Sequence, residues 1–140
     1  MKILLAVDGS DYTKRMLSYL AAHEELLGRR HEYTVIHSVH AVPSHAASYV
    51  GAANVKQVYD EEAEAVFRPV RAFLHLQGIE ATFVQRAGRA AQSIASVAED
   101  GKFDLLVMGS HGHGNLANLV LGSLASKVLA LCMTPVLIVR

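Results

Sequence analysis

Short apolar segments alternate with segments of helical spacing along the whole chain, and this alternation constrains the fold more than any other feature. Apolar runs that predict strands lie at residues 3–7, 33–39, 79–86, 103–108 and 135–139. Continuous apolar runs are typical of strands that are covered on both faces. The segments between them carry apolar residues at helical spacing, and predict helices at 11–27, 55–77, 90–99 and 122–131. This order predicts a mainly parallel sheet with helices on both faces.

Two interruptions of this pattern carry local predictions. Residues 41–53 are rich in small side chains, include Pro43 and Gly51 and lack a clear period, so we expect a loop there. Pro69 lies inside the helix expected at 55–77 and should kink or split it. Nothing in the chain marks a repeat or an internal boundary, so we expect residues 1–140 to form one domain with its own core.

Composition and charge limit the classes of partner that the protein is expected to bind. Thirteen Lys and Arg residues balance thirteen Asp and Glu residues, which argues against a general nucleic-acid surface or an acidic-membrane binder. The single cysteine, Cys132, excludes an intrachain disulfide and is expected to be a small buried hydrophobe. No apolar run approaches membrane-spanning length, and the first apolar run is too short for a signal peptide. We therefore expect a soluble cytoplasmic protein without membrane insertion.

A glycine pattern follows the fourth expected strand. Gly109 and Gly112 are followed, after nine residues, by Gly122 and Ser123. Backbone N–H groups can reach an anion where no Cβ intervenes, and a helix N-terminus offers free donors and a favourable dipole. We expect the first two glycines to let the backbone approach a ribose or phosphate, and the N–H groups of the last pair, with the serine hydroxyl, to hold terminal phosphates. For any one of them alone, ordinary turn or capping chemistry is the simpler explanation.

Asp8 follows the first expected strand. In an open parallel sheet, ligands bind beyond the carboxyl ends of the strands, where the strand order reverses. If the order is 3-2-1-4-5, the reversal lies between the first and fourth strands, and Asp8 and Gly109 face one crevice. The carboxylate suits ribose hydroxyls, or a magnesium ion held through water. Its other interpretation is a cap on the first helix, a position that Ser10 or Asp11 can also fill.

Over its full length the chain resembles the universal stress proteins. The resemblance rests on residues 5–10 (Leu-Ala-Val-Asp-Gly-Ser), 104–112, 121–123 and 134–139. The nucleotide-binding branch of that family carries Gly-x2-Gly-x9-Gly-Ser/Thr, which Gly109, Gly112, Gly122 and Ser123 match with the nine-residue spacer intact. The resemblance implies a three-layer α/β/α fold around a five-stranded parallel sheet of order 3-2-1-4-5. This fold is Rossmann-like and similar to that of the adenine nucleotide alpha hydrolases.

The resemblance also implies a ligand and an assembly. ATP, or else ADP or AMP, would bind across the first and fourth strands, together with magnesium. Asp8 would lie at the nucleoside, and the backbone of Val39, or of Ser38, would contact adenine. A homodimer through the last strand and a further protein partner of unknown identity are also implied.

The chain departs from the family pattern around the second glycine. Many nucleotide-binding members carry Lys or Arg shortly after it and again within the spacer, whereas this chain has His113 and Ala117, with Asn115 between them. Positive charge near the phosphates is therefore expected to be thin. A histidine titrates near neutrality, so His113 is a candidate for a pH-dependent phosphate contact. Lys127 is expected to be a solvated helix residue.

The catalytic signals are weak. The chain lacks the Gly-Lys-Ser/Thr of a P-loop, a clear general base and a nucleophile elbow, so no catalytic residue and no metal-ligand set is assigned. The resemblance implies an ATP-binding regulator of the stress response, in which nucleotide biases a partner-binding surface. Two alternatives stay open: a slow ATPase or autokinase with Ser123 as phosphate acceptor, and a dimeric interaction module that has lost nucleotide.

Overall fold

The computed structural model describes residues 1–114 and 118–140. The elements are β1 (Lys2–Ala6), α1 (Asp11–Ala22), α2 (Glu24–Leu27), β2 (Glu32–Val39), α3 (Ser44–Val50), α4 (Ala52–Leu76), β3 (Ala81–Ala87), α5 (Ala90–Asp100), β4 (Leu105–Gly109), α6 (Ser123–Leu131) and β5 (Val136–Val139). Asn115 and Ala117, which belong to the spacer considered above, lie outside the described residues. Among the described helices, none is both long and apolar enough to cross a membrane.

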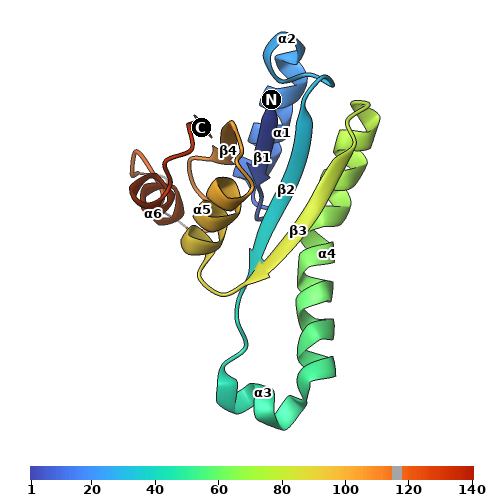
Figure 1. Cartoon of the computed structure of the whole chain (residues 1–140), viewed down its shortest axis with the longest axis vertical. Coiled ribbons are helices and arrows are strands. Elements are labelled where there is room, and N and C mark those ends of the chain that lie inside the picture. Colours follow the sequence, from blue (N-terminus) through green and yellow to red (C-terminus); the bar gives the residue numbers. More distant parts are fainter. Residues whose placement is uncertain (115–117) are drawn as a thin grey trace.

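The strands form one parallel sheet in the order β3-β2-β1-β4-β5, which confirms the predicted fold class (Figure 1). β1 is central, with Leu5 opposite Val35 of β2 and opposite Val107 of β4. The chain leaves β1 toward β2 on one side and later returns beside β1 as β4 on the other. The strand order therefore reverses between β1 and β4, at the point where ligands bind in sheets of this kind.

Alternating side chains on the sheet build two separate apolar clusters, one on each face. Ile3 and Leu5 point into the cluster covered by α1 and α4, whereas Leu4 and Ala6 point into the cluster covered by α5 and α6. This alternation follows from the two-residue period of a strand. Because both faces are covered, β1, β2 and β4 are buried along most of their length, which is why the sequence pattern predicts them well. β3, at the edge of the sheet, has no buried residue.

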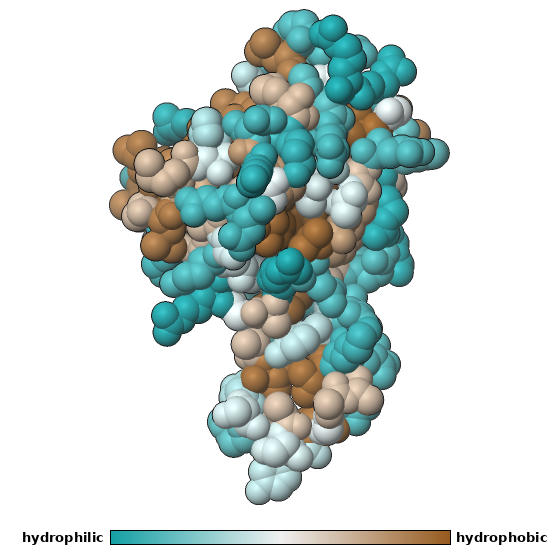
Figure 2. All heavy atoms as spheres, in the orientation of Figure 1, coloured by the Kyte–Doolittle hydropathy of each residue, from teal (hydrophilic) through white to brown (hydrophobic). Residues whose placement is uncertain are grey.

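The prediction of a loop at 41–53 is wrong. Residues 44–50 form α3, and α4 begins at Ala52, directly after Gly51 with its positive φ of 88°. α3 contains no buried residue, so it has no apolar face that could produce a helical period. Figure 1 shows α3 and the first turns of α4 projecting from the body, and Figure 2 shows apolar side chains at the surface of this projecting part.

Two further helix predictions need correction. α4 runs from Ala52 to Leu76 with Pro69 inside it, so of the kink or split expected at this proline, the split does not occur. The single helix expected at 11–27 is instead two helices separated at His23, whose φ and ψ are −124° and 52°. The His23 ring lies against the Tyr19 ring, with 4.0 Å between the ring centroids, and His23 Nδ1 lies 2.8 Å from the Tyr19 carbonyl oxygen. These local contacts compete with a continued helix.

Tyr33 joins β2 to the end of α2 and carries a stability prediction. Its buried hydroxyl donates to the carbonyls of Leu27 and Gly28, and burial raises the pKa of this hydroxyl from 10.0 to about 12. The folded state therefore favours the neutral phenol, and this contribution to stability is present below pH 10 and is lost as pH rises through 12. We expect Tyr33→Phe to lower the free energy of unfolding by about 1–3 kcal/mol at neutral pH, because two buried carbonyls lose their donor.

Urea unfolding at about pH 9 and about pH 11 checks the pH part of this prediction. Wild type should lose more unfolding free energy across that interval than Tyr33→Phe, which has no phenol to ionise. Equal losses in the two proteins would contradict it.

Candidate functional site

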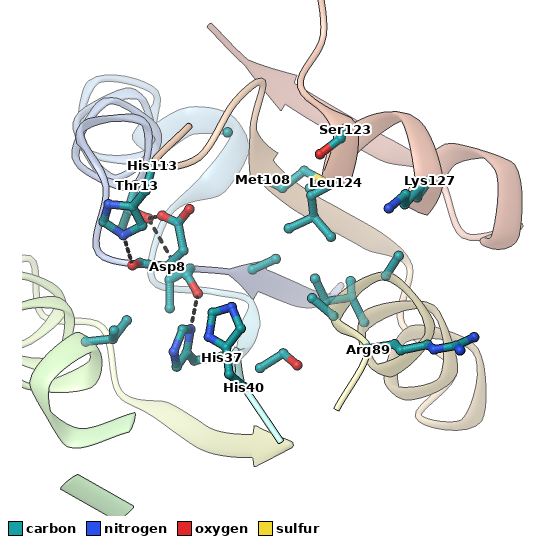
Figure 3. A pocket seen from close by; sticks show the side chains of 18 of the residues that line it. Asp8, Thr13, His37, His40, Arg89, Met108, His113, Ser123, Leu124 and Lys127 are labelled. Atoms are coloured by element: carbon teal, nitrogen blue, oxygen red, sulfur yellow. Dashed lines mark hydrogen bonds between the residues drawn. The ribbon is translucent and has the colours of Figure 1, made fainter. Parts of the chain in front are cut away.

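A pocket of about 840 Å³ lies at the carboxyl ends of β1, β2 and β4. It is lined from both sides of the sheet, by α4 on one side and by α5 and α6 on the other, and by the turn that follows β4 (Figure 3). Its volume is in the range of small-molecule sites. The pocket contains several of the predicted residues, namely Asp8, Gly109, His113 and Ser123.

Asp8 organises the turn between β1 and α1. Its Oδ1 accepts hydrogen bonds from the Ser10 N–H, at 2.9 Å, and from the Thr13 hydroxyl, at 3.0 Å, while the Asp8 N–H donates to the same hydroxyl. Ser10 occupies the N-cap position of α1, but its hydroxyl makes no capping hydrogen bond, so neither Ser10 nor Asp11 caps this helix with its side chain. The Asp8 carboxylate therefore closes the turn before α1 through Oδ1, and its role toward a ligand stays a prediction.

The glycines of the motif are needed because a side chain at these positions would come too close to neighbouring atoms. A Cβ on Gly112 would lie 2.7 Å from Asp8 Oδ2, and a Cβ on Gly109 would lie 2.7 Å from the Cβ of Tyr12 in α1. A Cβ on Gly122 would lie 3.1 Å from the Ser110 carbonyl oxygen. The missing side chains thus allow the turn after β4 to approach β1, α1 and α6 closely. Gly112 and Gly122 are not among the residues that line the pocket.

The start of α6 faces the pocket through Ser123 and Leu124. Gly122 is the N-cap residue, and its N–H donates to the Ser110 carbonyl at 2.7 Å, so the expectation that this N–H is free for a phosphate is wrong. The first hydrogen bond within the helix runs from the Ser126 N–H to the Gly122 carbonyl. The N–H groups of Ser123, Leu124 and Ala125 therefore have no partner within the helix, and they can take an anion.

At the end of β2 the pocket contacts Ser38, whereas Val39 points away. The Val39 side chain is buried in the cluster under α1 and α4, and its carbonyl already accepts from the Gly88 N–H at 3.1 Å. Ser38 lines the pocket. The structure thus places Ser38, the alternative to Val39 and the residue before it in β2, at the pocket.

His113 and His111 hold the segment after β4 in place. The His113 Nε2–H donates to the Asp8 main-chain carbonyl at 2.6 Å. His111 receives the Ser110 hydroxyl on Nδ1 and donates from Nε2 to the Leu119 carbonyl. Both rings line the pocket.

His37 contributes a buried imidazole that the sequence analysis did not single out. It is 8% exposed and lines the pocket, and its Nδ1–H donates to the Val7 carbonyl at 2.8 Å. Nε2 has no hydrogen-bond partner among the described residues, and lies 3.8 Å from Glu62 Oε1. Glu62 also approaches His40, at 3.6 Å. Only the two-residue period of β2 and its end at the pocket could have indicated this residue from sequence.

Two cations also line the pocket, and the sequence analysis assigned neither of them to it. Lys127 of α6 is exposed, as expected of a solvated helix residue, and it also lines the pocket together with Arg89, the N-cap residue of α5. Figure 3 shows Ser123 and Lys127 on one side of the pocket, across from Asp8, His37 and His40, with the Arg89 side chain extending outward at its edge. The orientation of Lys127 follows from the packing of α6, which buries Ala125 and Val128 against the sheet.

Comparison with known proteins decides the family. The model of the "Universal stress protein family" matches residues 1–140. This chain belongs to the universal stress protein family. A universal stress protein of Thermus aquaticus is 36% identical over 138 residues, which cover 99% of this chain and 97% of that protein. The solved structure of MJ0577, a universal stress protein of Methanocaldococcus jannaschii, is 27% identical, with a TM-score of 0.78 over 99% of this chain and 94% of that chain.

Some structural neighbours of this universal stress protein are complexes with adenine nucleotides. The universal stress protein of Archaeoglobus fulgidus in complex with dAMP is 20% identical, with a TM-score of 0.69, and the match covers 100% of this chain and 98% of that chain. A universal stress protein in complex with cAMP is also 20% identical, with a TM-score of 0.70 and coverage of 100% and 97%. At this identity the likeness shows the shared fold.

Proposed function

We propose that this universal stress protein binds ATP across the carboxyl ends of β1 and β4 and acts as a nucleotide-dependent regulator in the stress response. The observation that carries the proposal is the arrangement of one pocket. Asp8 lies on one side of it, and the first turn of α6, with three N–H groups that have no partner within the helix, lies on the other. A carboxylate suits ribose hydroxyls and a helix N-terminus suits phosphate, so the two sides match the two halves of a nucleotide.

The proposal assigns each site residue a role. Asp8 binds the ribose, the backbone at Ser38 and Val39 meets the base, and Ser123 with the first turn of α6 holds phosphate. Gly109, Gly112 and Gly122 permit the close packing of the turn that brings these groups together. Magnesium, which prefers oxygen ligands and retains water, would accompany the phosphates, with the Ser123 hydroxyl as an oxygen on that side of the pocket.

A homodimer through β5 is part of the proposal. β5 is an edge strand of the sheet, and edge strands present unpaired N–H and C=O groups that can pair with another chain. Exposed apolar side chains in α6 and in the segments just before and after it support such an interface; they are Leu119, Val120, Leu129, Leu131 and Met133. We also propose that residues 1–140 act as one nucleotide-binding domain and that the protein works in the cytoplasm, where its single free cysteine would stay reduced.

Identification of the resident ligand tests the proposal. Protein purified without added nucleotide is denatured, and the released small molecules are identified by mass spectrometry. We expect an adenine nucleotide, and we expect Mg-ATP to raise the melting temperature of protein stripped of ligand. If no nucleotide is released and Mg-ATP gives no thermal shift, the dimeric interaction module without nucleotide is the better account.

The contact between His113 and the phosphates remains a prediction with its own test. A protonated imidazole adds positive charge near the phosphates, so ATP affinity should fall as pH rises from about 5.5 to about 8, the range in which histidine titrates. His113→Ala should remove the trend, as measured by calorimetry at each pH. A flat profile in wild type would exclude this role.

A further inference from the structure

The charged residues that line the pocket are segregated by sign. Asp8 and Glu62 stand on the side of β1 and α4, whereas Arg89 and Lys127 stand on the side of α5 and α6. No ion pair within the described residues uses either of these cations. The acidic side would repel phosphate and the basic side would attract it, so the pocket favours one orientation of a ligand with an anionic end.

Lys127 is placed to reach an anion at the start of α6. It lies four residues after Ser123, so the two side chains share a face of the helix about 6 Å apart along its axis. Helical side chains tilt toward the N-terminus, which directs the ammonium group toward the N–H groups of the first turn. Lys127 and the free N–H groups of Ser123 and Leu124 can therefore contact the same anion.

Arg89 supplies a second cation at a second helix start. The pocket is lined by Gly88, Arg89 and the first three residues of α5, and the first hydrogen bond within α5 runs from the Ser93 N–H to the Arg89 carbonyl. The N–H groups of residues 90–92 have no partner within the helix, as at the start of α6. Opposite these donors lies the buried His37, whose Nε2 has no hydrogen-bond partner among the described residues.

We infer that Arg89 and Lys127 form a polyphosphate subsite that makes this protein selective for nucleoside triphosphates over monophosphates. The inference rests on the proposed function, and goes beyond it by naming the groups that distinguish a triphosphate from a monophosphate. The α-phosphate lies on the ribose side of the start of α6. The β- and γ-phosphates lie between the starts of α5 and α6, where Lys127 reaches them and the exposed Arg89 side chain can turn toward them. Arg89 and Lys127 thereby replace the cations that the turn after β4 lacks at His113.

Calorimetric titration of wild type, Arg89→Gln, Lys127→Gln and the double variant with Mg-ATP, Mg-ADP and AMP tests the inference. Wild type should bind ATP more tightly than ADP, and ADP more tightly than AMP. Each single substitution should weaken ATP binding about five- to ten-fold, because a hydrogen bond to a charged group is lost. AMP binding should change by less than about two-fold, since the monophosphate does not reach the two cations.

Lys102→Gln is the matched control, because it removes one positive charge at the other end of α5, beyond Gly101. It should leave all three affinities unchanged. The inference is overturned if the double variant binds ATP like wild type, or if ATP and AMP weaken equally. If wild type binds none of the three nucleotides, the proposed function fails and the inference fails with it, so the two failures are distinguishable.

Discussion

Gly112→Ala is expected to weaken binding of adenine nucleotides at least about ten-fold while the protein stays folded. The new Cβ would lie 2.7 Å from Asp8 Oδ2, closer than such contacts occur, so the carboxylate or the turn must move. Asp8 cannot rotate freely, because its Oδ1 is held by the Ser10 N–H and the Thr13 hydroxyl. The backbone at Gly112 does not have a positive φ, so alanine adds no strain of its own there. Binding can be measured by calorimetry and folding by thermal melting.

Substitution of Asp8 by asparagine tests whether nucleotide binding depends on the negative charge of this residue, and the same substitution at Asp11 is the control. Asp8→Asn retains an oxygen for the Ser10 N–H and the Thr13 hydroxyl but removes the negative charge, so it should weaken nucleotide binding with little loss of stability. Asp11→Asn is the control, because Asp11 is an exposed residue of the first turn of α1 and does not line the pocket. The role of Asp8 would be refuted if Gly112→Ala and Asp8→Asn both bound ATP with wild-type affinity.

Leu106→Ala should lower the free energy of unfolding by about 2–5 kcal/mol. Leu106 is fully buried in β4, in the cluster that α5 and α6 cover, and close-packed surroundings cannot collapse fully into the space that the substitution leaves. Urea unfolding measures the change. The cost is a large fraction of the total stability of a domain of this size.

Leu76→Ala is the matched control for this substitution. It removes the same atoms from the end of α4, where the side chain is 81% exposed, and should change the unfolding free energy by less than about 0.5 kcal/mol. Similar effects at the two positions would contradict the assignment of Leu106 to the core. Saturating ATP at about 100 times the dissociation constant should restore about 2.7 kcal/mol to Leu106→Ala, if the pocket still forms.

The sheet could be predicted from the sequence because its inner strands, β1, β2 and β4, are buried on both faces. Ile3, Leu5, Leu106 and Val107 belong to continuous apolar runs, and such runs end at the turns that carry Asp8 and Gly109. α3 was missed for the opposite reason, since its residues meet no core and carry no periodic signal. Pro69 was expected to kink or split α4; the apolar contacts of Phe67, Val70 and Leu74 on either side of it keep one unsplit helix against the sheet.

The candidate site was predicted in part. The motif brought Asp8, Gly109 and Ser123 together because their positions follow from the strand order. The rotation of a helix about its axis and the side chains that neighbouring elements add do not follow from spacing within one motif. For this reason Lys127 and Arg89 could not be placed, and the choice between Ser38 and Val39 needed the observed end of β2.

The pocket is bounded by residues of both apolar clusters, which the sheet otherwise keeps apart. His37 and Val66 belong to the side of α1 and α4, and Ile94 and Leu124 to the side of α5 and α6. A ligand that spans the strand ends therefore touches both halves of the core at once. Its binding free energy opposes local opening of either half, so amide hydrogen exchange should slow on both sides of the sheet together, and the protein should unfold as one cooperative unit more strictly with ligand than without it.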